Sequence, residues 1–224
     1  MKLGVAAALF VLPACSVFAS PEPAEPPRAA RRPAPARAAA PEATVEESAP
    51  ARRVGDVAVH RFSGEYRKTP LLFTERVVAR EARAWVVDLT LDDGESSRSL
   101  RMRFDLQGRP LTAARIEGEH EVPVPIDEYH AFVEPTVFAA DQNDGLLGVA
   151  RATCLVGERE LDCETKNYRV RVGGRRAELK VTGSAAVPGR DVSGEITTSD
   201  GRVVYRAELI ELGHERSSPS LAGR

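Results

Sequence analysis

The side chains best able to do chemistry gather in one short stretch, residues 117–130. It holds two histidines, His120 and His130, and the carboxylates of Glu119, Glu121, Asp127 and Glu128. A histidine beside a carboxylate can ligate a metal or act as a general acid and base. The two histidines are ten residues apart with prolines between them, and no spacing fixes a third ligand. The pattern favours a polar loop leading into a short helix; a hydrolase or metal enzyme around His120 and His130 is the alternative.

A second group of oxygen ligands occurs in the sequence DQNDG, which runs from Asp141 to Gly145. Calcium loops of the EF-hand type place acidic or amide residues at positions 1, 3 and 5, followed by glycine. Here the glycine arrives one residue early. Because Asp, Asn and Gly are also common turn formers, we interpret the stretch as a turn. Asp141 and Asp144 remain alternative metal ligands.

Several common catalytic and binding motifs are missing from the sequence. It has no Gly-x-Ser-x-Gly elbow, no phosphate-binding loop and no dinucleotide fingerprint. The formal net charge is −2, which gives no basic surface for nucleic acid. We therefore expect a non-enzymatic protein without a cofactor and without a nucleic-acid partner.

The N-terminus has the pattern of an export signal. Lys2 precedes an apolar run of ten residues, from Leu3 to Leu12. Such a run is too short to cross a hydrocarbon core of ~30 Å, which needs about 20 helical residues. It fits the apolar region of a secretory signal, so residues 1–19 are predicted to be a signal peptide. Ordinary signal peptidase would cut after Ala19.

The end of this apolar run carries a further motif. Leu12-Pro13-Ala14-Cys15 resembles the lipobox of bacterial lipoproteins, with Pro13 as the departure from the usual small residue. The resemblance implies cleavage before Cys15 and lipid attachment to its sulfur, so that the membrane becomes a partner through the N-terminal lipid. Ser16, in place of Asp, then implies an outer-membrane anchor facing the periplasm or the cell surface. Cleavage after Ala19 would instead give a soluble periplasmic or secreted protein.

The next segment, residues 20–53, consists largely of Pro, Ala, Arg and Glu. It shows no apolar pattern that could pack, so we expect a disordered tether. Pro-rich chain extends by ~3.1 Å per residue, which gives a reach on the order of 100 Å. Residues 217–224 are expected to form a disordered tail, leaving residues 54–216 as the folded domain.

This domain alternates apolar and polar residues with a period of two. In residues 99–106, Leu100, Met102 and Phe104 point one way while arginines point the other. Turn residues follow each such run, which is typical of antiparallel hairpins. We expect strands at 56–62, 71–80, 85–91, 99–106, 110–117, 168–172, 177–183, 192–198 and 202–212, and one short helix at 126–133. The predicted fold is all-β: an antiparallel, strongly curved sheet of nine or ten strands, either an unclosed barrel or a sandwich.

Two cysteines lie in the domain, at the ends of CLVGERELDC. If the turn centres on Glu158 and Arg159, Cys154 faces Cys163 across a hairpin. Directly opposed residues are close enough for a disulfide, and an exported protein meets an oxidising compartment. We predict this bond, with unpaired thiols as the alternative. Cys15 then leaves the fold through lipidation or cleavage.

These features predict a class of function without a specific activity. A curved sheet offers a concave apolar face, so the domain is expected to bind a lipid, a glycan, a peptide or a protein partner in the cell envelope. The alternative is a structural or assembly lipoprotein that has no small ligand. Its mark would be an exposed apolar patch or an open sheet edge in place of a pocket.

Overall fold

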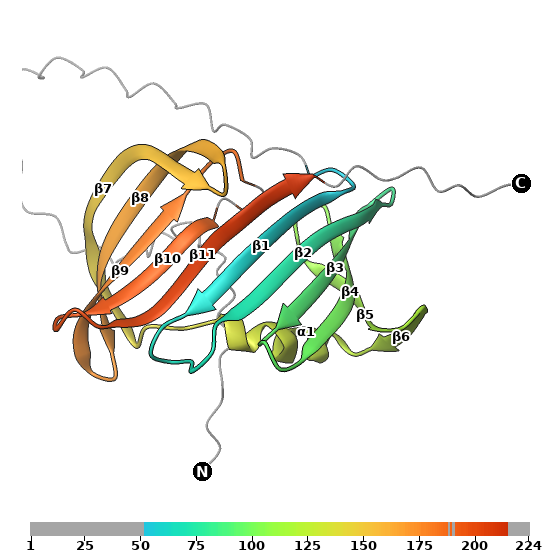
Figure 1. Cartoon of the computed structure of the whole chain (residues 1–224), viewed down its shortest axis with the longest axis horizontal. Helices are drawn as coiled ribbons and strands as arrows, with labels where there is room; N and C mark the ends of the chain where they lie inside the picture. The colour runs from blue at the N-terminus through green and yellow to red at the C-terminus, as the bar shows by residue number, and fades with distance from the viewer. Residues whose placement is uncertain (1–51, 188, 190, 215–224) are drawn as a thin grey trace, which may run out of the picture. The chain divides into compact units, whose positions relative to one another are not determined.

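The protein forms a single open sheet. A computed structural model describes residues 52–187, 189 and 191–214. In this part, eleven antiparallel strands follow the order β6-β5-β4-β3-β2-β1-β11-β10-β9-β8-β7, so β6 and β7 are the two edges (Figure 1). The strands are β1 (Asp56–Ser63), β2 (Leu71–Arg80), β3 (Ala84–Asp92), β4 (Ser97–Asp105), β5 (Pro110–Glu117), β6 (His120–Val124), β7 (Gln142–Val156), β8 (Arg159–Val172), β9 (Arg175–Gly183), β10 (Asp191–Thr198) and β11 (Val203–His214).

The predicted all-β fold with an antiparallel, unclosed sheet is confirmed, and the helix α1 spans Ile126–Val133 as expected. A short 3-10 helix, η1 (Glu134–Thr136), follows it. Two expectations were incomplete. The polar stretch after Glu117 is not a loop, because His120–Val124 pairs with β5 as a strand. The stretch from Asp141 to Gly145 is not a simple turn, because β7 begins at Gln142.

Alternation places one row of each strand on the inner face of the sheet. Val87, Leu89 and Leu91 of β3 are buried on this face. Leu100 and Met102 of β4 are their cross-strand neighbours and are buried on the same face. Helix α1 covers this face with Phe132, which packs with these residues into one core. Arg115 of β5 holds the helix from outside through Glu128, 2.9 Å away. The inner face of this half of the sheet is therefore filled by the chain's own side chains.

The β7–β8 hairpin contributes to two separate cores. Val170 packs in the core under α1, whereas Leu161 and Cys163 pack with Val192 and Leu209 in a second cluster. Val170 and Cys163 are seven residues apart, so their side chains leave opposite faces of β8. Two-stranded ribbons twist more strongly than wide sheets, which allows both faces to become buried in turn.

The connection from β1 to β2 crosses β11 closely. Gly64 adopts a φ of 122°, and a Cβ built on it would lie 2.5 Å from the carbonyl oxygen of Val204. Only glycine fits this position, because any side chain would meet backbone and would also strain φ. This close contact ties the central strand β1 to its neighbour β11.

The N-terminal predictions concern residues outside the described part of the chain. They are the signal peptide 1–19, its lipobox 12–15 with Cys15, and most of the tether 20–53. The predicted C-terminal tail, residues 217–224, also lies outside the described part. They stay predictions. Within the described residues, no helix is both long and apolar enough to cross a membrane.

Candidate protein-binding edge

The histidines singled out in the sequence belong to two different elements. His120 is exposed at the start of β6, opposite Glu117 of β5. His130 lies in α1, where its ring is 5.5 Å from that of Tyr129. In the part of the chain that the structure describes, no group of three or more His, Cys, Asp or Glu side chains could hold a metal ion.

Asp141 and Asp144 bind other parts of the same ribbon. One carboxylate oxygen of Asp141 accepts a hydrogen bond from the backbone N–H of Gly174, 3.1 Å away. The carboxylate of Asp144 lies 3.3 Å from Nε of Arg171. These contacts hold the start of β7 against the β8–β9 turn and the end of β8. The structure thus gives these carboxylates a structural use.

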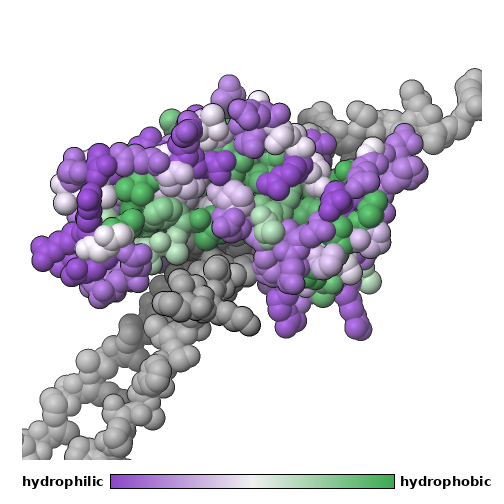
Figure 2. Space-filling view, turned by 90° about the horizontal axis from the view of Figure 1, so that it is seen from below, coloured by the Kyte–Doolittle hydropathy of each residue, from purple (hydrophilic) through white to green (hydrophobic). Residues whose placement is uncertain are grey.

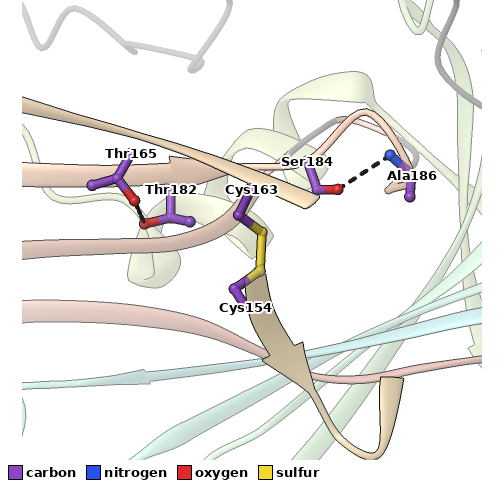
Figure 3. The surroundings of a disulfide bond; sticks show 6 residues. All are labelled: Cys154, Cys163, Thr165, Thr182, Ser184 and Ala186. Atoms are coloured by element: carbon purple, nitrogen blue, oxygen red, sulfur yellow. Dashed lines mark hydrogen bonds between the residues drawn. A yellow bond between two sulfur atoms is a disulfide. The ribbon is translucent and has the colours of Figure 1, made fainter. Parts of the chain in front are cut away.

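The predicted disulfide joins Cys154 and Cys163, with Cα atoms 5.9 Å apart (Figure 3). The predicted hairpin register is wrong. Val156 pairs with Arg159, and Cys154 stands opposite Leu161, so the two cysteines are diagonal neighbours on one face. The reason is a two-residue turn at Gly157 and Glu158, where glycine takes a φ of 58°.

The hydroxyl groups of Thr165 and Thr182 meet at 2.9 Å beside this bond and link β8 to β9 (Figure 3). Gly157, at the tip of the hairpin, lies against β11, because a Cβ there would be 3.7 Å from the carbonyl oxygen of Ile210. The disulfide and these contacts fix the end of the hairpin on the second core.

Polar side chains also reach the inner face near its centre. Glu75 of β2 points there, and its carboxylate lies 3.5 Å from the guanidinium of Arg52. The neighbouring His60 of β1 is largely buried, and this desolvation lowers its pKa, although the charges of Glu75 and Asp191 oppose the shift. Burial likewise raises the pKa of Tyr129, which approaches the inner face from α1. Asp191 of β10 lies close enough to His60 for the charge of each group to influence the pKa of the other.

One hollow among the described residues has a volume of about 400 Å³ and is a solvent-open depression lined by Tyr66, Arg67, Lys68, Glu134, Pro135 and Val137. Viewed from the side of α1, hydrophobic surface occurs in separate areas bounded by hydrophilic residues (Figure 2). This arrangement differs from the apolar pocket expected of a lipid carrier.

The two edges of the sheet differ sharply. The β6 edge, His120–Val124, has five residues and includes Pro123, which has no N–H to offer. The β7 edge, Gln142–Val156, has fifteen residues and no proline. Four of its large apolar side chains are exposed, namely Leu146, Leu147, Val149 and Leu155, the last at 69%. Long apolar edges are usually avoided, because they pair with other chains.

The second half of the β7 edge has a regular backbone. Register shifts interrupt its pairing with β8 at Asn143/Gly145 and at Leu146/Gly148, but none occurs from Gly148 to Val156. In a hairpin with a two-residue turn, the flanking residues, here Val156 and Arg159, form a hydrogen-bonded pair. Along the two strands, hydrogen-bonded and non-hydrogen-bonded pairs then alternate. The residues whose N–H and C=O groups point away from β8 are therefore Val149, Arg151, Thr153 and Leu155. We call residues 149–155 the open stretch.

Sequence reasoning missed the open stretch. The turn-forming residues of DQNDG and the glycines at 145 and 148 hid the beginning of β7. The alternation of Val149, Arg151, Thr153 and Leu155 with small residues was the available signal, but it cannot show that a strand lies at an edge.

Comparison with known proteins identifies no family. No family model and no curated protein matches the chain. Among solved structures, a hypothetical protein of Chlamydia trachomatis is 15% identical, with a TM-score of 0.42 over 77% of this chain and 94% of that one. MucB, solved in complex with MucA(peri), is 12% identical, with a TM-score of 0.38 over 77% of this chain and 54% of its own. A putative exported protein of Bacteroides fragilis with a YmcC-like fold is 9% identical, with a TM-score of 0.30 over 72% of this chain and 96% of that one. Similarities of this size carry no argument about the function of this chain.

Proposed function

We propose that the chain is an exported, non-catalytic assembly protein whose β-domain binds a protein partner through the β7 edge. The partner adds a strand beside β7 and pairs with the free backbone groups of the open stretch. In strand addition, main-chain hydrogen bonds supply affinity and alternate side chains supply specificity. The single observation that carries this proposal is a long, proline-free edge with exposed apolar side chains.

The inner face supports a protein partner over a small ligand. Phe132 of α1 already covers the inner face of the sheet, together with the side chains of β2, β3 and β4. A lipid would need to displace this helix, which Arg115 and Glu128 hold in place. The β7 edge needs no such rearrangement, because its apolar side chains are exposed in the present structure.

The proposed location follows from the N-terminus. The lipobox-like sequence would attach lipid to Cys15, and residues 20–53 would act as a tether that lets the domain reach a partner away from the membrane. The intact Cys154–Cys163 bond fits an oxidising compartment. Mass spectrometry of the detergent-extracted protein tests the anchor, because a diacylglyceryl group on Cys15 changes the mass of the N-terminal peptide.

Site-specific crosslinking tests the binding edge. A photo-crosslinking amino acid is placed at Thr153 on the β7 edge, or at Val122 on the β6 edge as the matched control. Both positions are exposed, so neither substitution disturbs the core. In intact cells we expect protein adducts from position 153 and none from position 122. Equal adducts from both edges, or none from position 153, would overturn the proposal.

A further inference from the structure

We infer that the strand bound at the β7 edge belongs to a second copy of this chain, so that two open stretches pair antiparallel around a twofold axis. This inference rests on the proposed function, since it names the partner of the same edge. A twofold interface requires a surface that complements itself. The sequence of the open stretch meets this requirement in one particular register.

The backbone first limits the possible registers. The outward-pointing groups belong to Val149, Arg151, Thr153 and Leu155, and each must meet an outward-pointing residue of the partner. A two-fold pairing can therefore place Arg151 opposite the partner's Arg151, opposite the partner's Thr153 or opposite the partner's Leu155, or can slide further until few bonds remain.

Side chains then select among these registers. Like charges directly opposite one another destabilise a sheet, which disfavours Arg151 against the partner's Arg151. Arg151 against the partner's Leu155 would bring a charge onto an apolar side chain. When Arg151 instead faces the partner's Thr153, Val149 faces the partner's Leu155, and both contacts occur twice because of the symmetry. The two exposed apolar side chains of the stretch thereby cover each other.

The charges of β8 agree with this register. Glu164 of β8 stands beside Arg151, and Asp162 stands beside Thr153. In the paired sheet, one row would read Glu164, Arg151, the partner's Thr153, the partner's Asp162. The arginine then lies between two carboxylates, one on each copy. The side chain of Arg151 is 84% exposed, and its ion pair with Glu164 lies on the surface. The guanidinium can therefore interact with both carboxylates.

The other face of the open stretch, on which Cys154 lies, also permits close approach. The residues between the outward-pointing ones are Ala150, Ala152 and Cys154, which are small, and Cys154 is held by its disulfide. In the selected register Ala152 meets the partner's Ala152 at the axis. No bulky side chain therefore stands between the two copies on this face.

Native mass spectrometry of the full-length mature protein in detergent tests the inference. Leu155→Lys places a charge opposite Val149 and should lower the dimer population at least tenfold, and Val149→Glu should do the same. Both residues are exposed, so the fold is expected to survive. The double variant places the new Glu opposite the new Lys and should restore the dimer. Val122→Lys on the β6 edge is the matched control and should leave the dimer unchanged.

Cysteine pairs then test the register. A mixture of Val149→Cys and Leu155→Cys proteins should crosslink through a disulfide, whereas either protein alone should not. A crosslink of Val149→Cys with itself, or of Leu155→Cys with itself, would overturn this register. A wild-type protein that is monomeric at all concentrations would overturn the inference. In that case, adducts of other proteins at position 153 would still support the proposed function, and their absence would overturn it as well.

Discussion

The two edges of this sheet face the same physical problem and solve it differently. At the β6 edge, Pro123 removes a donor, the strand is only five residues long, and Glu121 is bound to Arg101 of β4 at 2.7 Å. At the β7 edge, bulges disturb the first half, but the open stretch keeps free backbone groups and exposed apolar side chains. Natural sheets usually protect their edges. This contrast within one molecule is the basis of the partner binding proposed above for the β7 edge.

The largest expected effect comes from disrupting the contact of Gly64 with β11, which lies in the middle of the sheet between the two edges. Gly64→Ala should lower the free energy of unfolding by roughly 3 kcal/mol or more, because the new Cβ meets the backbone of β11 and φ is strained. Chemical denaturation measures this change. Gly94→Ala is the matched control: its φ is also positive, but nothing lies within 4 Å, so the loss should be about 1 kcal/mol. Equal losses in both variants would contradict the close contact at Gly64.

Removing the disulfide should destabilise the β7 edge locally and leave the β6 edge unaffected. Replacing Cys154 and Cys163 together by serine should lower the free energy of unfolding by about 2.5–3 kcal/mol, since the bond closes a loop of about ten residues. Amide hydrogen exchange should accelerate in β7 and β8, while β5 and β6 stay unchanged below the global unfolding limit. A uniform acceleration at both edges would show that the bond does not act locally.

Lowering the pH should reduce the stability of the domain through a group in the middle of the sheet, so the effect should not differ between the two edges. His60 lies in β1, the sixth of the eleven strands, and its folded pKa is lowered by burial. The unfolded chain therefore binds more protons, so stability should fall as pH drops from about 6.5 towards the lowered value.

The control for this pH dependence is His60→Leu, which should flatten the decline in that window when denaturation midpoints are compared between pH 7.5 and 5.5. Asp191 faces His60 and its own pKa is raised, so its contribution has the opposite sign at lower pH. An unchanged slope in the His60→Leu protein would rule out His60 as the cause.

The smallest expected effect concerns the protection of the β6 edge. Arg101 bonds Asp88 of β3 at 2.6 Å and Glu121 of β6 at 2.7 Å. Arg101→Ala should cost about 1 kcal/mol and should speed exchange of the β6 amides. Arg103→Ala is the control, because Arg103 pairs with Glu81 and does not reach β6. Faster exchange in β7 instead of β6 would contradict this account.

The sequence predicted most elements because their signals are local. The alternation in β3 and β4, the turn residues between them and the helix at 126–133 each depend on neighbours in the chain, and all agree with the structure. The cysteine pairing was also predicted correctly, although the register was not. Gly157 moved the turn by one residue, since a two-residue turn with positive φ was more favourable than the centre assumed at Glu158 and Arg159.

The candidate site could not be predicted in the same way. Whether a strand is central or at an edge depends on which distant strands pair, and here β1 joins β11 across almost the whole domain. That pairing leaves β6 and β7 at the ends. The sequence by itself determined the strands, the helix and the cysteine pair, because these follow from local periodicity and turn chemistry. Only the tertiary structure decided that α1 fills the inner face and that residues 149–155 remain open, because both depend on long-range packing.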